Sequence, residues 1–409
     1  MNQLINFKSS YINNINYYLI IIFPISLLAG SLVSNLFLII ISILFLIELK
    51  MQKRFYILKN NNLFFLILIY IYLILNSIFI ANNEESLIRS LGFIRFIIFT
   101  YALSYYFYFY EKKLVKYWTI IFLIVAFDII FEYLFGKNIL GNFADYPGRI
   151  ASFTGDELKI GTFFLGLFFI ALNFFKKKND KIFLLIFLVF IGISFLIGER
   201  SNFIKFAIIS VLYFIFFNKM SFKKKILFFL ITLFLSILIL SSNHKLRAKY
   251  INHIFLNSYE NILDQNQEVN LINIINNNQH FLHYYVAAKI LYDNPIFGSG
   301  AKTFRYESQK NEYNDFQDLH GGSTHPHQFH FEILSELGIV GYILIMSHLL
   351  ALLIAQRKKN LSFLNVGGIL YIIATLVPLL PSGSFFTSYT AAFFWINYSF
   401  LIGFNLKKI

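Results

Sequence analysis

Long apolar runs recur along the whole chain, each about 17–25 residues long, the length that crosses a bilayer as a helix. Only 14% of the residues are charged and 57% are hydrophobic, whereas a soluble domain carries about 25% charged residues. We therefore expect one all-α, polytopic membrane domain, with helices packed on one another inside and lipid outside. The expected helices are 17–32, 33–49, 62–81, 87–110, 117–136, 159–175, 182–197, 202–217, 226–240, 331–355, 361–380 and 390–404.

Lysine clusters stand between these runs and favour one orientation. If the N-terminus is cytoplasmic, every lysine cluster falls on the cytoplasmic side, with about 21 of the 35 basic residues there. This pattern accounts for the net charge of +14, so we expect no nucleic-acid partner. The clusters predict about twelve transmembrane helices with both termini inside, and they place residues 137–158 and 241–329 outside.

The runs divide the chain into three parts. Helices one to nine occupy residues 1–240, a large outer loop with a histidine cluster occupies 241–330, and helices ten to twelve occupy 331–409. The first run follows a polar start and lacks a small-residue cleavage site, so we expect a retained helix. The chain has no cysteine, which excludes disulfides and thiol chemistry.

The large outer loop changes character along its length. Residues 257–278 are rich in asparagine and are expected to be loosely ordered. Gln279–Asp293 is patterned as an amphipathic helix on the membrane surface, ended by Asn294-Pro295. Gly298-Ser299-Gly300 predicts a flexible turn with exposed backbone N–H groups, followed by Arg305. The apolar face of the expected helix consists of Phe281, Tyr285, Ala288, Ile290 and Leu291.

Three histidines, His325, His327 and His330, lie where this loop meets the tenth run. Imidazole is the side chain that exchanges a proton near neutrality, so one histidine is a candidate general base. The alternative is a zinc site, with Glu332 and Glu336 as the nearest acids. Pro326 stiffens the backbone between the first two histidines, which favours the general base.

Several ionisable residues fall in the outer halves of the expected helices. Arg95, Asp128, Glu132 and Lys205 could line a basic cavity that opens to the outside, because buried charges usually face a wet interior. Alternatively, Arg95 pairs with one of the two acids as a structural bridge and Lys205 snorkels to the surface.

The turn Gly198-Glu199-Arg200-Ser201 carries an arginine whose planar fork suits a pair of phosphate oxygens. The other interpretation is a loop cation paired with the adjacent Glu199. The chain has neither G-x-x-x-x-G-K-[ST] nor G-x-G-x-x-G, so we expect no cytoplasmic nucleotide as donor or energy source.

Residues 325–341 resemble the signature of the O-antigen ligase family, which has a histidine, a polar residue, nine residues and then spaced glycines. Here His327 and Gln328 are followed by nine residues and by Gly338 and Gly341. Residues 294–304 and the Arg200 turn are similar to two further segments of that family. Its layout, with one large outer loop between helices nine and ten, also resembles the order of runs described above.

The resemblance implies a glycosyltransferase of the bacterial inner membrane with a periplasmic active site. The donor would be a glycan on undecaprenyl diphosphate, and the acceptor a sugar hydroxyl of lipid A–core. His327 would be the base, and arginines would stabilise the diphosphate leaving group without a metal or cofactor. The expected diphosphate ligands are Arg200, Arg305 and Arg149, with His325, Arg95, Lys205 and Gln328 in supporting roles.

Two other functions fit the same sequence features in part. A polymerase of O-antigen or exopolysaccharide would use the same donor and transfer it to another carrier-linked glycan. A lipid-carrier flippase or transporter is expected to show repeated halves and polar residues at mid-membrane depth. The chain has no convincing internal repeat and its charges gather at one face, which favours a surface enzyme.

Overall fold

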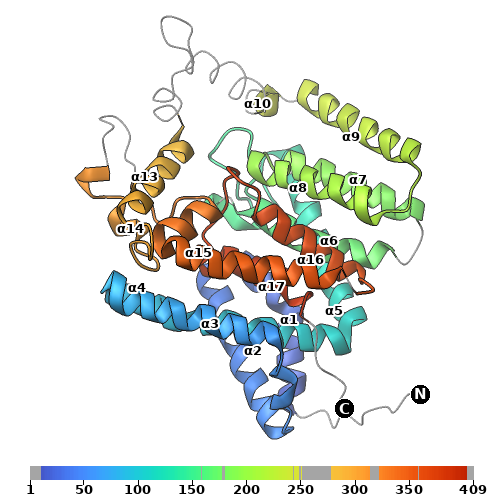
Figure 1. Ribbon diagram of the computed structural model, residues 1–409. Helices are drawn as coiled ribbons and strands as arrows, with labels where there is room; N and C mark the ends of the chain where they lie inside the picture. The colour runs from blue at the N-terminus through green and yellow to red at the C-terminus, as the bar shows by residue number, and fades with distance from the viewer. Residues whose placement is uncertain are drawn as a thin grey trace, which may run out of the picture.

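The computed structural model describes residues 11–157, 159–176, 180–242, 244–247, 250, 278–313, 322–357 and 359–402. These residues form an assembly of helices without a strand, as predicted for the fold class. α3, α15 and α16 run in roughly the same direction, α2 crosses them steeply, and α13 and α14 lie at one end of these helices (Figure 1). The predicted loose segment 257–278 lies outside the described residues, apart from Asn278.

The helix bounds follow the apolar runs closely in most places. The described α-helices are α1 (Tyr11–Leu28), α2 (Ser31–Met51), α3 (Asn61–Asn76), α4 (Glu84–Gly92), α5 (Ile94–Phe135), α6 (Ile160–Lys176), α7 (Asp180–Leu196), α8 (Arg200–Leu212), α9 (Phe222–Ser242), α10 (His244–Arg247), α13 (Gln279–Asp293), α14 (Phe304–Glu307), α15 (Phe329–Gln356), α16 (Phe363–Thr375) and α17 (Ser388–Ser399). Short helical turns add η1 (Phe55–Leu58), η2 (Ser77–Ala81), η3 (Ser152–Glu157), η4 (Tyr213–Phe217) and η6 (Asn311–Tyr313).

Seven helical segments among the described residues are long and apolar enough to cross a membrane, judged by length and composition. Two shorter apolar helices, α6 and α16, pack inside the bundle. The runs 87–110 and 117–136, predicted as two helices, form α4 and the 42-residue α5 instead. The backbone of Tyr110 is non-helical (φ −124°, ψ 22°) and bends α5 near the lysines 112, 113 and 116.

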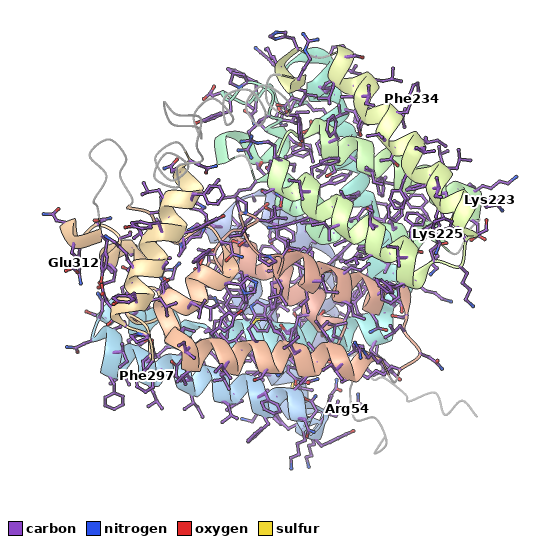
Figure 2. All side chains as sticks on the ribbon, turned by 45° about the horizontal axis from the view of Figure 1, so that its top comes forward. Arg54, Lys223, Lys225, Phe234, Phe297 and Glu312 are labelled. Atoms are coloured by element: carbon purple, nitrogen blue, oxygen red, sulfur yellow. The ribbon has the colours of Figure 1, made fainter. Side chains whose placement is uncertain are left out.

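Aromatic rings fill the interior. Phe168 of α6 contacts Phe187 of α7 and Phe206 of α8, with ring centroids 5.1 and 4.2 Å apart. In a bilayer the hydrophobic effect does not drive helices together, because lipid tails are as apolar as the helix surfaces. Close packing of such ring pairs therefore contributes to helix association. By contrast, only 6% of the α9 span is buried, and Phe234 lies on its outer surface (Figure 2).

Asp128 and Glu132 of α5 accept hydrogen bonds from the loop that follows this helix. Asp128 accepts hydrogen bonds from the Ile139 N–H (2.9 Å) and the Ser152 hydroxyl (2.6 Å). Glu132 accepts from the backbone N–H groups of Ala151 and Ser152 at 2.9 and 2.6 Å. The predicted bridge to Arg95 is therefore wrong for these two acids, because their carboxylate oxygens bind the loop.

α15, one of the helices long and apolar enough to cross a membrane, is broken at Gly338, whose backbone has a positive φ angle (φ 66°, ψ −172°). The break leaves carbonyl and N–H groups without partners inside the helix, and residues 295–300 bind them. Ser299 and Gly300 donate to the carbonyls of Ser335 and Glu336, each at 2.9 Å. Ile339 in turn donates to the Pro295 carbonyl at 2.9 Å.

The turn at 298–300 is therefore not a flexible loop with exposed N–H groups, as the sequence predicted. It completes the backbone hydrogen bonding of α15, because buried N–H and carbonyl groups need partners. A side chain at Gly338 would come within 2.5 Å of the backbone of Ile296 and Gly298, which explains the glycine. This joint fixes the start of α15, where the histidines lie.

The helix predicted at Gln279–Asp293 is present as α13, with the predicted bounds. Its buried face shares Ile290 with the predicted one but is otherwise different: Leu282, Val286 and Ile290 pack against Phe304, Tyr313 and Phe331. Phe281 and Ala288 of the predicted face are exposed, so α13 presents them outward.

Candidate active site

A cavity of about 730 Å³ opens where α13, α15 and the loop before α17 meet the ends of α2, α6 and α8. This volume lies within the range of roughly 300–1,000 Å³ that is typical of ligand sites. Among the described residues that line it, cations outnumber acids five to one: Arg89, Lys159, Lys205, Lys302 and Arg305 against Glu199. The cavity therefore favours an anionic ligand.

His327 lines this cavity in a left-handed backbone conformation (φ 58°), which is uncommon for a residue other than glycine and frequent at functional sites. Its carbonyl accepts a hydrogen bond from the Ser382 N–H at 2.7 Å. Its Nε2 lies 3.2 Å from the Ser323 hydroxyl. Contacts on both the backbone and the ring thus hold the side chain in place.

Three other imidazoles surround His327. The ring centroid of His325 is 4.1 Å away, and those of His283 and His280 on α13 are 5.3 and 5.4 Å away. His325 also lines the cavity, and its Nε2 is buried without a hydrogen-bond partner. The two α13 histidines were missed in the sequence, where they stand more than 40 residues before the motif.

The site keeps His327 and His325 neutral. Burial is the largest cause, and together with the neighbouring histidines and Lys302 it lowers the pKa of His327 to about 3. Burial and the Lys302 ammonium likewise lower the pKa of His325 to about 3. A histidine must be neutral to accept a proton, so His327 has the protonation state of a base at physiological pH.

The third motif histidine points elsewhere. His330 Nε2 lies 2.8 Å from the Leu376 carbonyl, and its Nδ1 lies 3.0 Å from the Tyr342 hydroxyl. The three motif histidines therefore do not converge as the zinc hypothesis requires. Within the described part of the chain, histidines and acids form no group of three placed to hold a metal ion.

Gln328 has a structural role at the beginning of α15. Its side-chain oxygen accepts a hydrogen bond from the Phe331 N–H at 3.0 Å, which makes it the N-cap of the helix. The residue is 2% exposed and does not line the cavity.

The two glutamates of α15 organise the cavity wall. Glu332 accepts the Phe385 N–H at 2.7 Å and pairs with the Lys302 ammonium at 3.4 Å. Glu336 accepts the N–H groups of Lys302 and Phe304 at 2.8 and 3.3 Å. Lys302 was not predicted as a site residue, although its position between Gly300 and Arg305 was a signal that could have found it.

Arg305 and Arg89 share one carboxylate at the cavity wall. Arg305 Nη1 lies 2.8 Å and Arg89 Nη2 lies 3.4 Å from the same oxygen of Glu85. The Tyr306 hydroxyl binds the other oxygen of Glu85. Arg305 Nε is buried and has no hydrogen-bond partner. Two guanidinium groups with one counter-ion leave a net positive charge for a ligand.

Arg200 and Arg149 come from the beginning of α8 and from the loop before α6. Glu199 pairs with Arg149 at 3.0 Å and accepts the Gly161 N–H at 3.3 Å, so it is engaged away from its sequence neighbour Arg200. The positive charge of Arg200 contributes to the lowered pKa of His280, after burial and His283, which places Arg200 near the histidine cluster. Neither Arg200 nor Arg149 lines the cavity itself.

Of the two predicted supporting cations, Lys205 lines the cavity and Arg95 does not. Lys205 is 5% exposed, lines the cavity and donates to the Pro381 carbonyl at 2.7 Å, so it does not snorkel. Arg95 donates to the Gly92 carbonyl and lies over the Phe96 ring at 4.5 Å. Because Arg95 is not among the cavity residues, the structure does not bring it to the site as predicted.

Comparison with known proteins agrees with this geometry. No curated protein shows significant similarity to the chain. A family model described as O-antigen ligase matches residues 183–346, a range that holds Arg200, Arg305 and His327. That match confirms the resemblance found in the sequence and places residues 183–346 in the O-antigen ligase family of membrane glycosyltransferases.

Proposed function

We propose that the protein is an O-antigen ligase-like glycosyltransferase. It moves a glycan from undecaprenyl diphosphate to a sugar hydroxyl of lipid A–core at the periplasmic face of the inner membrane. The observation that carries the proposal is the neutral His327 in the wall of a cavity that also presents Arg305 and Arg89. A base beside a cationic surface is what transfer from a diphosphate requires.

The proposed reaction exchanges one bond for another. The acceptor hydroxyl gives its proton to His327, and its oxygen forms a bond to the anomeric carbon of the donor sugar. The bond from that carbon to the phosphate oxygen breaks, and the diphosphate leaves with its electron pair. Arg305 and Arg89 stabilise the charge that develops on the leaving group, with Arg200 and Arg149 as further candidates.

Cationic side chains supply the neutralisation that a metal provides in many phosphoryl sites, so the proposal needs no metal. The guanidinium groups of Arg89 and Arg305 already lie within 3.4 Å of one acidic oxygen of Glu85. A phosphate oxygen can take the place of that carboxylate oxygen because both are anionic acceptors.

The membrane orientation follows from charge. Lys223 and Lys225 lie on the side of the molecule opposite Glu312, which is near the cavity end (Figure 2). The positive-inside rule then puts the lysines in the cytoplasm and the cavity in the periplasm. A helix of 42 residues is about 63 Å long, roughly twice the hydrocarbon thickness, so we assign one of the twelve proposed passes to each side of the bend at Tyr110.

The test is an analysis of lipopolysaccharide in a strain whose chromosomal gene is deleted and replaced by variants. We expect free lipid A–core and accumulated carrier-linked polymer in the deletion strain, with transfer restored by the wild type. Core that carries a single repeat unit would instead identify a polymerase. Normal lipopolysaccharide in the deletion strain would refute both.

Two variants connect the phenotype to the site. His327→Ala should insert normally and fail to transfer, because the base is lost. Arg200→Lys keeps the charge but loses the planar fork, so we expect a strong loss of transfer. Normal transfer by His327→Ala would exclude the base, and normal transfer by Arg200→Lys would reduce Arg200 to a loop cation.

A further inference from the structure

The loop between α16 and α17 has no assigned role, yet it forms a large part of the cavity wall. All seven residues from Pro381 to Thr387, called here the 381–387 loop, line the cavity. None of them is charged: the loop reads Pro-Ser-Gly-Ser-Phe-Phe-Thr. It therefore contrasts with the cationic wall formed by Arg89, Lys302 and Arg305.

Groups of the proposed catalytic site hold this loop in place. Lys205 donates to the Pro381 carbonyl, and the Ser382 N–H donates to the His327 carbonyl, both at 2.7 Å. Further along, Lys302 lies 3.0 Å from the Ser384 hydroxyl and Glu332 accepts the Phe385 N–H. Such a fixed backbone is the kind of surface that binds a ligand without losing entropy.

Besides His325 Nε2, two neutral polar atoms on cavity residues have no hydrogen-bond partner among the described residues. They are the Ser382 hydroxyl oxygen and the side-chain carbonyl oxygen of Asn35, near the N-terminus of α2. An unsatisfied buried polar atom is costly, and its presence at a site calls for a ligand that supplies the missing bond. A serine hydroxyl reaches such a ligand by a change between staggered rotamers.

Aromatic rings complete this part of the wall. Phe385, Phe386 and Phe394 line the cavity beside the neutral polar groups. A sugar ring has an apolar face of C–H groups and an edge of hydroxyl groups, so it matches a surface of rings with neutral donors and acceptors. A diphosphate matches the cationic wall instead.

We propose that the 381–387 loop, together with Asn35, binds the uncharged sugar ring of the acceptor. The Ser382 N–H donates a hydrogen bond to the His327 carbonyl, so Ser382 is next to the proposed base. A sugar that binds Ser382 would therefore have a hydroxyl close to His327. This inference rests on the proposed function for the name of its ligand, but binding itself is measurable without transfer.

The binding test uses the full chain in nanodiscs and methyl glycosides of common neutral hexoses and N-acetylhexosamines as probes. Saturation-transfer NMR detects ring protons that contact the protein. We expect signals for at least one neutral glycoside, and a loss of about three- to tenfold in affinity in Ser382→Ala and in Asn35→Leu. Ser347→Ala is the matched control, because Ser347 is exposed on α15 and its hydroxyl is bonded to the Leu344 carbonyl.

The outcomes separate the two proposals. Wild-type protein that binds none of the glycosides, or variants that bind them as tightly as the wild type, would overturn the sugar site. A protein that binds glycosides through Ser382 and Asn35 but never transfers a glycan would keep the site and refute the proposed function. In an active protein, the two variants should raise the acceptor KM by about three- to tenfold and leave the donor KM unmoved. A rise in the donor KM alone would overturn the assignment to the acceptor.

Discussion

His327 shows how its surroundings can keep a histidine neutral over a wide pH range, as the proposed base requires. Its ring lies among three other imidazoles and near Lys302, and burial is the largest cause of its low pKa. The charged form is disfavoured, so the neutral form persists as the pH falls.

We predict that the transfer rate does not fall between pH 8 and pH 5, because His327 titrates at about 3 and not near 6.5. His283→Phe removes one neighbouring imidazole, so the pKa of His327 should rise and the acid limb should move to higher pH. Initial rates on the reconstituted protein measure both profiles. An acid limb centred near 6.5 in the wild type would contradict the neutral site.

Glu85 is the counter-ion of two cavity arginines and should compete with an anionic ligand for them. Glu85→Gln removes the competing charge. We expect inorganic pyrophosphate to bind about two- to fivefold more tightly to this variant, since partly exposed ion pairs contribute little individually. Isothermal titration of the protein in nanodiscs gives the affinity.

Glu312→Gln serves as its control, because Glu312 is exposed and lies 3.9 Å from Lys310, whereas Arg89 and Arg305 form their ion pairs with Glu85. Equal or weaker binding of pyrophosphate by Glu85→Gln would show that Glu85 orients the arginines rather than competing for them.

At the scale of elements, the break in α15 sets the geometry of the site. Gly338 permits the positive φ angle at the break, and residues 295–300 fill the gap in backbone hydrogen bonding that the break leaves. Tyr72 of α3 also donates to the Leu337 carbonyl at 2.6 Å, and Asn76 donates to the Phe297 carbonyl at 2.7 Å. The glycines of the His327 motif thus serve the join between α3, α15 and the outer loop.

Gly338→Ala should destabilise the protein by about 2 kcal/mol or more, because a side chain there meets backbone within 2.5 Å and the φ angle is positive. Gly192→Ala is the matched control: Gly192 lies inside α7 with nothing within 4 Å of an added side chain. Alanine should raise stability slightly there. Thermal unfolding in detergent compares the two, and equal melting temperatures would contradict the role of the break.

The sequence predicted what depends on local pattern and missed what depends on pairs distant in the chain. Apolar runs located most helices, and α13 was predicted with its bounds. The predicted end of a helix at residue 110 coincides with the bend in α5, but the continuation of α5 past it and the pairing of 298–300 with α15 leave no periodic signal and were missed. The same holds for Lys302 and Ser382, whose places in the cavity depend on contacts with Glu332 and His327.

At the scale of the whole molecule, buried polar side chains form two separate groups. One group lies at the cavity and includes the histidines. A second buried polar cluster surrounds Glu48 of α2, which accepts from the Asn13 amide at 2.7 Å and from the Tyr106 hydroxyl at 2.5 Å. No cavity residue belongs to this cluster, so we interpret it as polar contact between packed helices. The proposed function requires that the cavity end faces the periplasm.

The absence of native cysteine makes this orientation directly measurable, because every label comes from an introduced thiol. Glu312→Cys, near the cavity end, should react with a membrane-impermeant maleimide in intact spheroplasts. Lys223→Cys should react only after lysis, since Lys223 lies on the opposite side of the molecule (Figure 2). Phe234→Cys should react poorly in both preparations, because this exposed side chain of α9 would lie among acyl chains that exclude the reagent. Labelling of Lys223→Cys before lysis would show that the topology is the reverse of the proposed one. His327 would then face the cytoplasm, which would exclude a donor presented in the periplasm.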